Sequence, residues 1–362
     1  MEKKVYNFNP GPAVLPKPVL EQVQAELLDF NGTGMSILEI SHRSKPYEGV
    51  HMEAEARMKK LLDLGDDYRC LFMQSGASGQ FAMIPMNFLT PGRTADYLLT
   101  GSWSQKAYKE AARLGNVHIA ASTQEENFNR IPSPDEITFS PNPVYAHLTS
   151  NNTIMGTQWQ DFPDCGEIPL MADMSSGILS RPFAAKKFSL IYAGAQKNLG
   201  PAGVTVVIIK QSLLEQIRED VPIIFNYKTH ADNNSLYNTP PAFAIYIVNL
   251  VLKWIEDNGG LAAMEAKNRE KAALIYKEID ESGGFYRGHA KKDSRSLMNI
   301  TFRLPDPDLE KKFVEESTAN GLIGLKGHRS VGGLRASLYN AMTLEGAQAL
   351  AAFMREFREK NS

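Results

Sequence analysis

The fold is decided by the stretch Leu190-Ile-Tyr-Ala-Gly-Ala-Gln-Lys-Asn-Leu-Gly-Pro-Ala-Gly-Val-Thr-Val-Val-Ile-Ile209. Two short apolar runs, Leu190–Ala193 and Val204–Ile209, predict two buried strands. Gly and Pro crowd the segment between the runs, as is usual where a chain turns. Runs of the same kind recur toward the N-terminus, so this stretch sets the pattern for much of the chain.

Lys197 is the unusual residue of this loop, because lysine strongly prefers solvent to the space between two buried strands. Gly194, Gly200 and Gly203 allow the backbone to fold closely around whatever the lysine holds. One interpretation is a surface lysine on an ordinary turn. The other is an amine nucleophile that forms a Schiff base with an aldehyde.

Outward from this loop, short apolar runs alternate with helical patterns, which is the signature of βαβ units and a mainly parallel sheet. The other strands are predicted at Arg69–Gln74, Asp96–Thr100, Val117–Ala121, Val144–Thr149 and Pro169–Asp173. The helices are predicted at Tyr47–Leu64, Gly79–Leu89, Trp103–Leu114 and Ser212–Arg218. The sequence therefore predicts an α/β fold with a seven-stranded, mainly parallel sheet.

The pattern changes after Pro240–Pro241 and predicts a smaller α+β domain. Its elements are expected at Pro241–Asp257, Leu261–Ser282, Leu297–Phe302, Asp308–Asn320, Leu334–Ser337 and from Leu344 onward, with a hinge near Gly259–Gly260. We expect a large domain over 17–262 and a small one over 263–362. Residues 1–16 hold three prolines, so they are expected to be extended and to lie across the body.

Composition excludes several classes of protein. The 362 residues carry 39 Lys+Arg and 41 Asp+Glu, a net charge of −2, without the basic block that a nucleic-acid or anionic-membrane partner would require. Two cysteines, Cys70 and Cys165, are too few for a disulfide framework and lack zinc-ligand spacing, so no metal is expected. The polar, proline-rich start is unlike a signal peptide, and no apolar run reaches membrane-spanning length. We expect a cytoplasmic protein.

Polar residues follow four more predicted strands, and the carboxyl ends of parallel strands meet at one edge of a sheet. Asp173 ends one strand; it is either a turn cap or an acid that keeps a pyridinium nitrogen protonated. The amides of Gly76–Gly79 begin a helix and form either a generic turn or a phosphate cradle. Trp103 is either core packing or a stacking face, and Thr153 adds a hydroxyl. Neither GK[ST] nor GxGxxG after a strand occurs, which excludes a P-loop.

Together with Lys197, this set of strand ends resembles the class-V branch of the fold-type-I pyridoxal-phosphate aminotransferases. The blocks that carry the resemblance span residues 6 to 341, nearly the whole chain. They are Tyr6-Asn-Phe-Asn-Pro-Gly-Pro12, Ser41-His-Arg-Ser-Lys45, Ser75-Gly-Ala-Ser-Gly-Gln-Phe81, Ala193–Gly203, Tyr237-Asn-Thr-Pro-Pro241 and His328-Arg-Ser-Val-Gly-Gly-Leu-Arg-Ala-Ser-Leu-Tyr-Asn-Ala341.

The resemblance implies pyridoxal 5′-phosphate as cofactor and a role for each matching residue. Lys197 would form the Schiff base, Asp173 would hold the pyridine nitrogen, Trp103 would stack on the ring and Thr153 would meet the 3′-oxygen. The cofactor phosphate would be held by Gly76, Ala77, Ser78 and Gln196, with Asn238 and Thr239 from the neighbouring subunit of a homodimer with shared active sites. Ser78 stands where some family members have arginine, so one anion contact must come from elsewhere.

The implied reaction moves the amino group of L-glutamate to 3-phosphohydroxypyruvate, in serine biosynthesis. Acceptance of 4-phosphohydroxythreonine, in pyridoxine biosynthesis, stays open. Arginine suits a site that takes either carboxylate or phosphate, because its planar fork binds both. The resemblance assigns Arg335 to the α-carboxylate. It assigns two His–Arg pairs, His42–Arg43 and His328–Arg329, to the distal anion. Without the resemblance, these arginines could equally be solvated surface residues.

Three other functions are weighed against this one. A cysteine desulfurase needs a cysteine on a C-terminal mobile loop, but Cys70 and Cys165 both precede Lys197. An aminotransferase for an unphosphorylated substrate, of the alanine–glyoxylate or serine–glyoxylate type, has no use for a second His–Arg pair. A non-catalytic pyridoxal-phosphate protein would not need the full set of lysine, acid and arginines.

Overall fold

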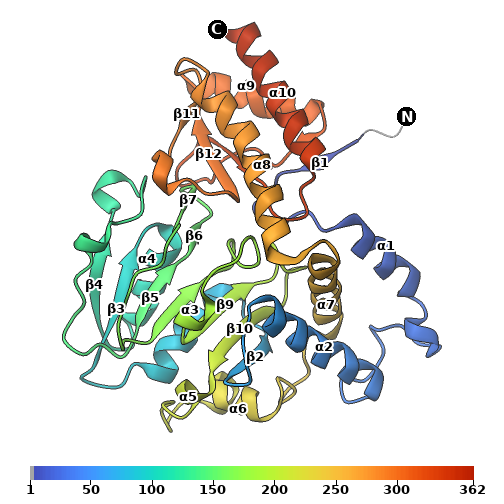
Figure 1. Cartoon of the computed structure of the whole chain (residues 1–362), viewed down its shortest axis with the longest axis vertical. Coiled ribbons are helices and arrows are strands. Elements are labelled where there is room, and N and C mark those ends of the chain that lie inside the picture. Colours follow the sequence, from blue (N-terminus) through green and yellow to red (C-terminus); the bar gives the residue numbers. More distant parts are fainter. Residues whose placement is uncertain (1–3) are drawn as a thin grey trace.

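A seven-stranded sheet forms the centre of the computed structural model, which describes residues 4–362 (Figure 1). Every neighbouring pair in the sheet is parallel except those of β10, which runs antiparallel to both β2 and β9. In spatial order the strands are β2 (Tyr68–Met73), β10 (Thr205–Lys210), β9 (Leu190–Gly194), β8 (Leu170–Asp173), β5 (Ala146–Thr149), β3 (Thr94–Leu99) and β4 (Asn116–Ser122). The predicted seven-stranded, mainly parallel sheet is confirmed.

Helices cover both faces of the central sheet, because its strands are apolar on both sides. On β2, Cys70 and Phe72 belong to one core cluster, and the alternate residues Leu71 and Met73 belong to another. The first face is covered by α2 (Lys45–Leu61) and α7 (Ala242–Asp257), with α1 (Lys17–Glu26) packed outside α7. The second is covered by α3 (Gly76–Phe88) and α4 (Ser102–Ala111). Helices therefore exclude water from both faces of the sheet.

The helix predicted at Ser212–Arg218 is too long. The observed α5 (Gln211–Leu214) stops after one turn, and α6 (Tyr227–Asp232) follows a loop. Arg218 is drawn out of helical register because its guanidinium donates to the Leu89 carbonyl and pairs with Asp220 at 2.6 Å. These tertiary contacts override the local helical pattern.

A C-terminal unit, running from α8 to α10, packs at one end of the molecule (Figure 1). Its antiparallel sheet is ordered β11 (Arg287–Gly288), β12 (Asn299–Arg303), β14 (Leu334–Ser337), and its helices are α8 (Gly260–Asp280), α9 (Pro307–Ala319) and α10 (Leu344–Asn361). These elements confirm the predicted ones to within two residues at nearly every end. The domain division between 262 and 263 falls in the first turn of α8 and stays a prediction.

The N-terminal segment is extended, as predicted, for the residues from 4 to 16; residues 1–3 lie outside the described chain. Its strand β1 (Tyr6–Asn7) pairs in parallel with β13 (Leu322–Ile323) of the C-terminal unit. The backbone N–H of Ala13 then donates to the Gln196 carbonyl at 2.9 Å, beside Lys197. The segment thus runs from the C-terminal unit to the edge of the central sheet. No helix of residues 4–362 is long and apolar enough to cross a membrane.

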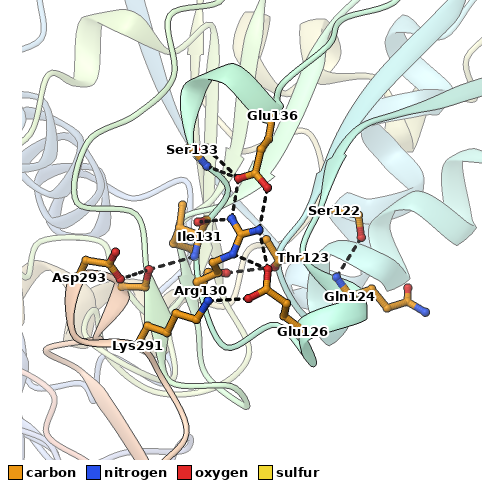
Figure 2. Close-up of polar contacts among 11 residues, drawn as sticks. Ser122, Thr123, Gln124, Glu126, Arg130, Ile131, Ser133, Glu136, Lys291 and Asp293 are labelled. Atoms are coloured by element: carbon orange, nitrogen blue, oxygen red, sulfur yellow. Dashed lines mark hydrogen bonds and ion pairs between the residues drawn. The ribbon is translucent and has the colours of Figure 1, made fainter.

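A polar network joins the C-terminal unit to the loop that follows β4 (Figure 2). Arg130 binds Glu136 through two nitrogens, at 2.5 and 2.7 Å, and Glu126 through Nε at 2.6 Å. Lys291 of the C-terminal unit donates to Glu126 at 2.6 Å, and its backbone N–H donates to the Asn129 carbonyl at 2.8 Å. The loop and the C-terminal unit are therefore connected by both charged and backbone contacts.

Candidate active site

The carboxyl ends of β2, β3, β5, β8 and β9 meet around one crevice of about 340 Å³. The strand-end residues predicted to converge do so: the lining includes Gly76, Ala77, Ser78, Trp103, Thr153, Asp173, Gln196 and Lys197, together with His328 and Arg335 of the C-terminal unit. Residues predicted from separate strand ends therefore line one cavity.

Lys197 lies in the hairpin between β9 and β10, where its Nζ donates to Thr153 Oγ1 at 2.8 Å. Burial lowers the pKa of Lys197 to about 8; the carboxylate of Asp173 opposes this shift, and the guanidinium of Arg335 adds to it. An amine with a pKa near neutrality is available both as a nucleophile and as a proton carrier. The surface-lysine interpretation is wrong.

Asp173 is the last residue of β8 and only 4% exposed. Within residues 4–362, the Asp173 carboxylate accepts two hydrogen bonds, and both reach Oδ1. Ser175 donates them, from its backbone N–H at 2.9 Å and from Oγ at 2.6 Å. Oδ2 is therefore left for a ligand in the crevice. Burial raises the pKa of Asp173, while Lys197 and Ser175 act against that shift. A bound cation at Oδ2 would hold the carboxylate ionised.

The turn between β2 and α3 has the backbone of an anion cradle. Ser75 has φ = 130° and Gly76 has φ = 63° at the N-terminus of α3, where the first backbone N–H groups of a helix are free to bind an anion. A Cβ on Gly79 would lie 2.3 Å from that of Ser75, so only glycine fits there. Ala77, Ser78 and Gln196 line the same end of the crevice.

Trp103, in the first turn of α4, is partly buried at the crevice, and its indole N–H is buried without a partner among the described residues. Lys197 Nζ lies 6.0 Å from the ring centroid, and Lys106, one turn further along α4, lies 4.1 Å from it. The indole therefore presents an aromatic surface next to the reactive amine.

Arg335 enters the crevice from β14 and is 6% exposed. Its Nη1 donates to the Thr153 carbonyl at 3.2 Å, while its buried Nε has no partner in residues 4–362. Burial lowers the pKa of His328, and the positive charges of Arg335, Arg329 and Lys106 lower it further. An anion bound here would satisfy the guanidinium and relieve the repulsion among these cations.

A second cavity of about 490 Å³ adjoins the crevice and shares Ile154, His328 and Arg335 with it. Its other basic residues are His289 and Arg303, and over residues 4–362 no aspartate or glutamate lines it. Gln124 and Asn127, from the loop braced by the network of Figure 2, form part of its wall. On the side of Arg335 the crevice thus opens into a space whose charged side chains, among residues 4–362, are arginines.

Five predicted site residues lie outside the crevice of the single chain. Asn238 lines a neighbouring cavity of about 250 Å³ that shares Ser75 with the crevice, and the Thr239 carbonyl accepts a hydrogen bond from Gln74 at 2.9 Å. Arg43 and Arg329 are exposed, and His42 has a buried Nε2 without a partner in the described chain. Arg329 directly follows His328 at the crevice mouth. The other four do not line the crevice of the single chain, and their roles stay predictions.

The chain matches known proteins over its whole length. The sequence profile of the family described as Aminotransferase class-V covers residues 5–350. The chain belongs to this family. This confirms the resemblance drawn from the six sequence blocks.

The relatives of this class-V aminotransferase agree with one another in name. Phosphoserine aminotransferase of Herpetosiphon aurantiacus is 60% identical over 356 residues, 98% of this chain and 99% of that protein. The solved phosphoserine aminotransferase of Bacillus circulans subsp. alkalophilus has a TM-score of 0.98, with 56% identity over 100% of both chains. A pyridoxal-phosphate-bound phosphoserine aminotransferase from Trichomonas vaginalis has a TM-score of 0.93, with 42% identity over 97% of this chain and 100% of that one.

More distant structures share only the fold. An alanine–glyoxylate aminotransferase from Nostoc has a TM-score of 0.73 with 15% identity over 99% of this chain and 96% of that one. The predicted fold type is thereby confirmed, and the chain is a pyridoxal-phosphate-dependent aminotransferase.

The residues of this class-V aminotransferase fit that cofactor. The free Oδ2 of Asp173 suits a protonated ring nitrogen, the amides after Ser75 suit a phosphate, and Trp103 supplies an aromatic face. The amine of Lys197 suits an aldehyde carbon. Each part of the cofactor therefore has a matching group among the crevice residues.

Sequence reasoning missed some residues of the site. Pro10 and Gly11 line the crevice, and Ser175, Ser176 and Asn151 hold its polar groups. Ser175 and Ser176 stand beside Asp173 in Met171-Ala-Asp-Met-Ser-Ser-Gly177, which is the one local signal that could have indicated them. Pro10 reaches the crevice because β1 pairs with β13. Each of these strands has only two residues, which is too short to show a strand pattern in the sequence.

Proposed function

We propose that this chain transfers the amino group of L-glutamate to 3-phosphohydroxypyruvate, giving O-phospho-L-serine and 2-oxoglutarate. The observation that carries the proposal is the pairing of a Lys197–Asp173 centre with a substrate side whose charged groups are all cationic. Relatives of 58% to 60% identity named phosphoserine aminotransferase support it. Both proposed substrates carry two acidic groups, so positive charge on both sides of the reacting carbon matches their chemistry.

Lys197 is the proton carrier of the reaction. Pyridoxal phosphate, when bound, accepts the electrons released when the proton leaves the substrate Cα. The Lys197 amine would take that proton from Cα and deliver it to the former aldehyde carbon of the cofactor, for which a pKa of about 8 is well placed. Asp173, held through Oδ1 by Ser175, would offer Oδ2 to the ring nitrogen of the bound cofactor.

Arg335 and the His–Arg pairs bind the two ends of the substrate. The buried, unpartnered Nε of Arg335 is positioned for the α-carboxylate, beside Thr153. His328 and Arg329 lie at the mouth toward the cationic cavity and would take the distal carboxylate or phosphate. With Ser78 in place of an arginine, the cofactor phosphate relies on backbone amides and on Gln196.

The proposal includes a homodimer with shared active sites. His42, Arg43, Asn238 and Thr239 do not line the crevice of their own chain, and their absence from it supports a role in the partner's site. The loop at Tyr237 presents an exposed tyrosine, and Pro240–Pro241 keeps the approach to α7 extended. Both cysteines are free, which supports the proposed location in the reducing cytoplasm.

The test uses the absorption spectrum of the purified protein. Glutamate should bleach the yellow of the bound cofactor, and 3-phosphohydroxypyruvate should restore it faster than unphosphorylated hydroxypyruvate at the same concentration. The Lys197→Ala variant should bind the cofactor and fail to turn over. An unchanged spectrum with glutamate, or equal rates with the two keto acids, would contradict the proposal.

A further inference from the structure

The anion cradle begins with a residue in a conformation that serine disfavours. Ser75 is the N-cap residue of α3 and has φ = 130° and ψ = −17°, a region that residues with a β-carbon rarely occupy. A Cβ on Gly79 would lie 2.3 Å from that of Ser75, so the serine side chain lies directly against the first turn of α3. A conformation of this kind persists only where other contacts hold it.

Gln80 supplies such a contact from inside the core. The Gln80 side chain is fully buried, and its Nε2 donates to Ser75 Oγ at 3.2 Å. Among residues 4–362, the Ser75 hydroxyl otherwise bonds only to the adjacent Gly76 carbonyl, at 3.3 Å. Gln80 is therefore the one described side chain that ties Ser75 to the rest of the molecule by a hydrogen bond.

The amide of Gln80 is itself held from its other side. The hydroxyl of Tyr227, a fully buried residue of α6, donates to Gln80 Oε1 at 2.6 Å. With its oxygen occupied by this donor, the amide presents Nε2 to Ser75. The Tyr227 ring stacks on Phe88 with the ring centroids 6.0 Å apart, and the Tyr227 backbone N–H donates to Asn87 Oδ1 at 3.1 Å. The donor to Gln80 thus has a fixed place in the core.

We propose that Gln80 is a positioning residue for the cofactor phosphate: it ties Ser75 to the core and thereby keeps the first backbone N–H groups of α3 in place for the anion. This inference deepens the proposed function and rests on it for the identity of the anion. Gln80 does not line the crevice, so its effect on the cofactor must pass through the turn at Ser75.

The Ser75→Gly substitution separates this role from a general role in the core. Glycine adopts a positive φ without steric strain, so a turn carrying Ser75→Gly should keep its shape without the bond from Gln80. A residue that only fills the core would be indifferent to the side chain at position 75. The effect of substituting Gln80 should therefore depend on the presence of the Ser75 side chain.

The experiment measures the affinity of the cofactor-free full chain for pyridoxamine phosphate and for pyridoxamine. Neither ligand forms a covalent bond with Lys197, and they differ only in the phosphate, so the ratio of their dissociation constants isolates the phosphate contribution. Equilibrium dialysis gives both constants. In Gln80→Met, which keeps the length of the side chain and removes its amide, pyridoxamine phosphate should bind roughly fivefold more weakly, the scale of one neutral hydrogen bond. Pyridoxamine should bind as it does to wild type.

The matched comparisons show where the effect arises. In a Ser75→Gly background, adding Gln80→Met should change the affinity for pyridoxamine phosphate by less than about twofold. Tyr145→Phe is the control, because it removes a buried hydrogen bond of the same core cluster, at 2.8 Å to the Tyr97 hydroxyl, without contacting the turn. Its ratio of dissociation constants should equal that of wild type.

Circular dichroism checks the fold of each variant. If Gln80→Met prevents folding, Tyr227→Phe is added to it, since this removes the hydroxyl that would be left without an acceptor. An unchanged ratio in the folded Gln80 variant would overturn the proposal. So would an equal loss in the Ser75→Gly background, or an equal loss in Tyr145→Phe.

The binding result stands apart from the proposed reaction. A wild type that binds pyridoxamine phosphate no more tightly than pyridoxamine would refute the anion cradle, and this inference with it. A wild type that shows the difference but does not transaminate would refute the proposed reaction, while the comparison of variants still decides the role of Gln80.

Discussion

Asp173→Asn tests the electron-sink role with almost no change in shape. The Asn side chain can keep both donors of Ser175 only by placing its oxygen at the position of Oδ1. Its NH₂ group then occupies the position of Oδ2 and faces the crevice. The variant thus replaces an anionic acceptor with a neutral donor, opposite a ring nitrogen that needs an acceptor.

The magnitude follows from this fixed orientation. Loss of a charge-assisted hydrogen bond costs about 1.5–3 kcal/mol, and a buried donor facing another donor adds about 1–3 kcal/mol. A total near 4 kcal/mol corresponds to a roughly thousandfold slower reaction. Single-turnover absorbance changes with glutamate would measure the effect, and Asp164→Asn, on an exposed loop, is the control. A loss below about tenfold, or 1.4 kcal/mol, would refute the reasoning.

Three further outcomes are expected. Arg329→Ala should weaken kcat/KM for 3-phosphohydroxypyruvate more than for hydroxypyruvate, by about 2–3 kcal/mol for one charge-assisted bond; equal losses would assign the arginine elsewhere. Thr239→Glu should block cofactor binding in the partner's site and Lys197→Ala should disable its own, so refolding an equal mixture should restore about a quarter of wild-type activity, since about half the dimers are mixed and each has one intact site. Mixed dimers without activity, identified by mass spectrometry, would place Thr239 in its own subunit's site. Because the pKa of Lys197 is about 8 in the fold and 10.5 for a fully solvated lysine, the unfolded chain binds more protons between these values. The free energy of unfolding of cofactor-free protein should therefore rise with pH across this window relative to Lys197→Met, as denaturant titrations would show; parallel curves for the two proteins would contradict the assignment.

The sequence was informative wherever a feature depends on neighbours along the chain. The apolar run Val204–Ile209 predicts β10 because the strand is buried on both faces, so each of its residues is apolar or small. Asp173 and Lys197 could be placed at one edge because parallel strands align their carboxyl ends. Features that depend on packing could not be predicted: Asn299 meets Asn151 through an alignment of two distant segments, and Arg218 leaves its helix to bind Leu89. The proposed roles of His42 and Thr239 involve a second chain, which no pattern within one sequence can place.

The pairing of β1 with β13 has a consequence for how the protein is made. Residues near position 6 leave the ribosome first, yet they can be fixed only after residues 322 and 323 have been synthesised. The central sheet, complete by residue 210, can form much earlier. Until nearly the whole chain has emerged, Pro10 and Gly11 are missing from the crevice, and so are His328 and Arg335. This long-range contact can therefore form only after residue 323 has been synthesised, and a nascent chain acquires the residues of its substrate side late in synthesis.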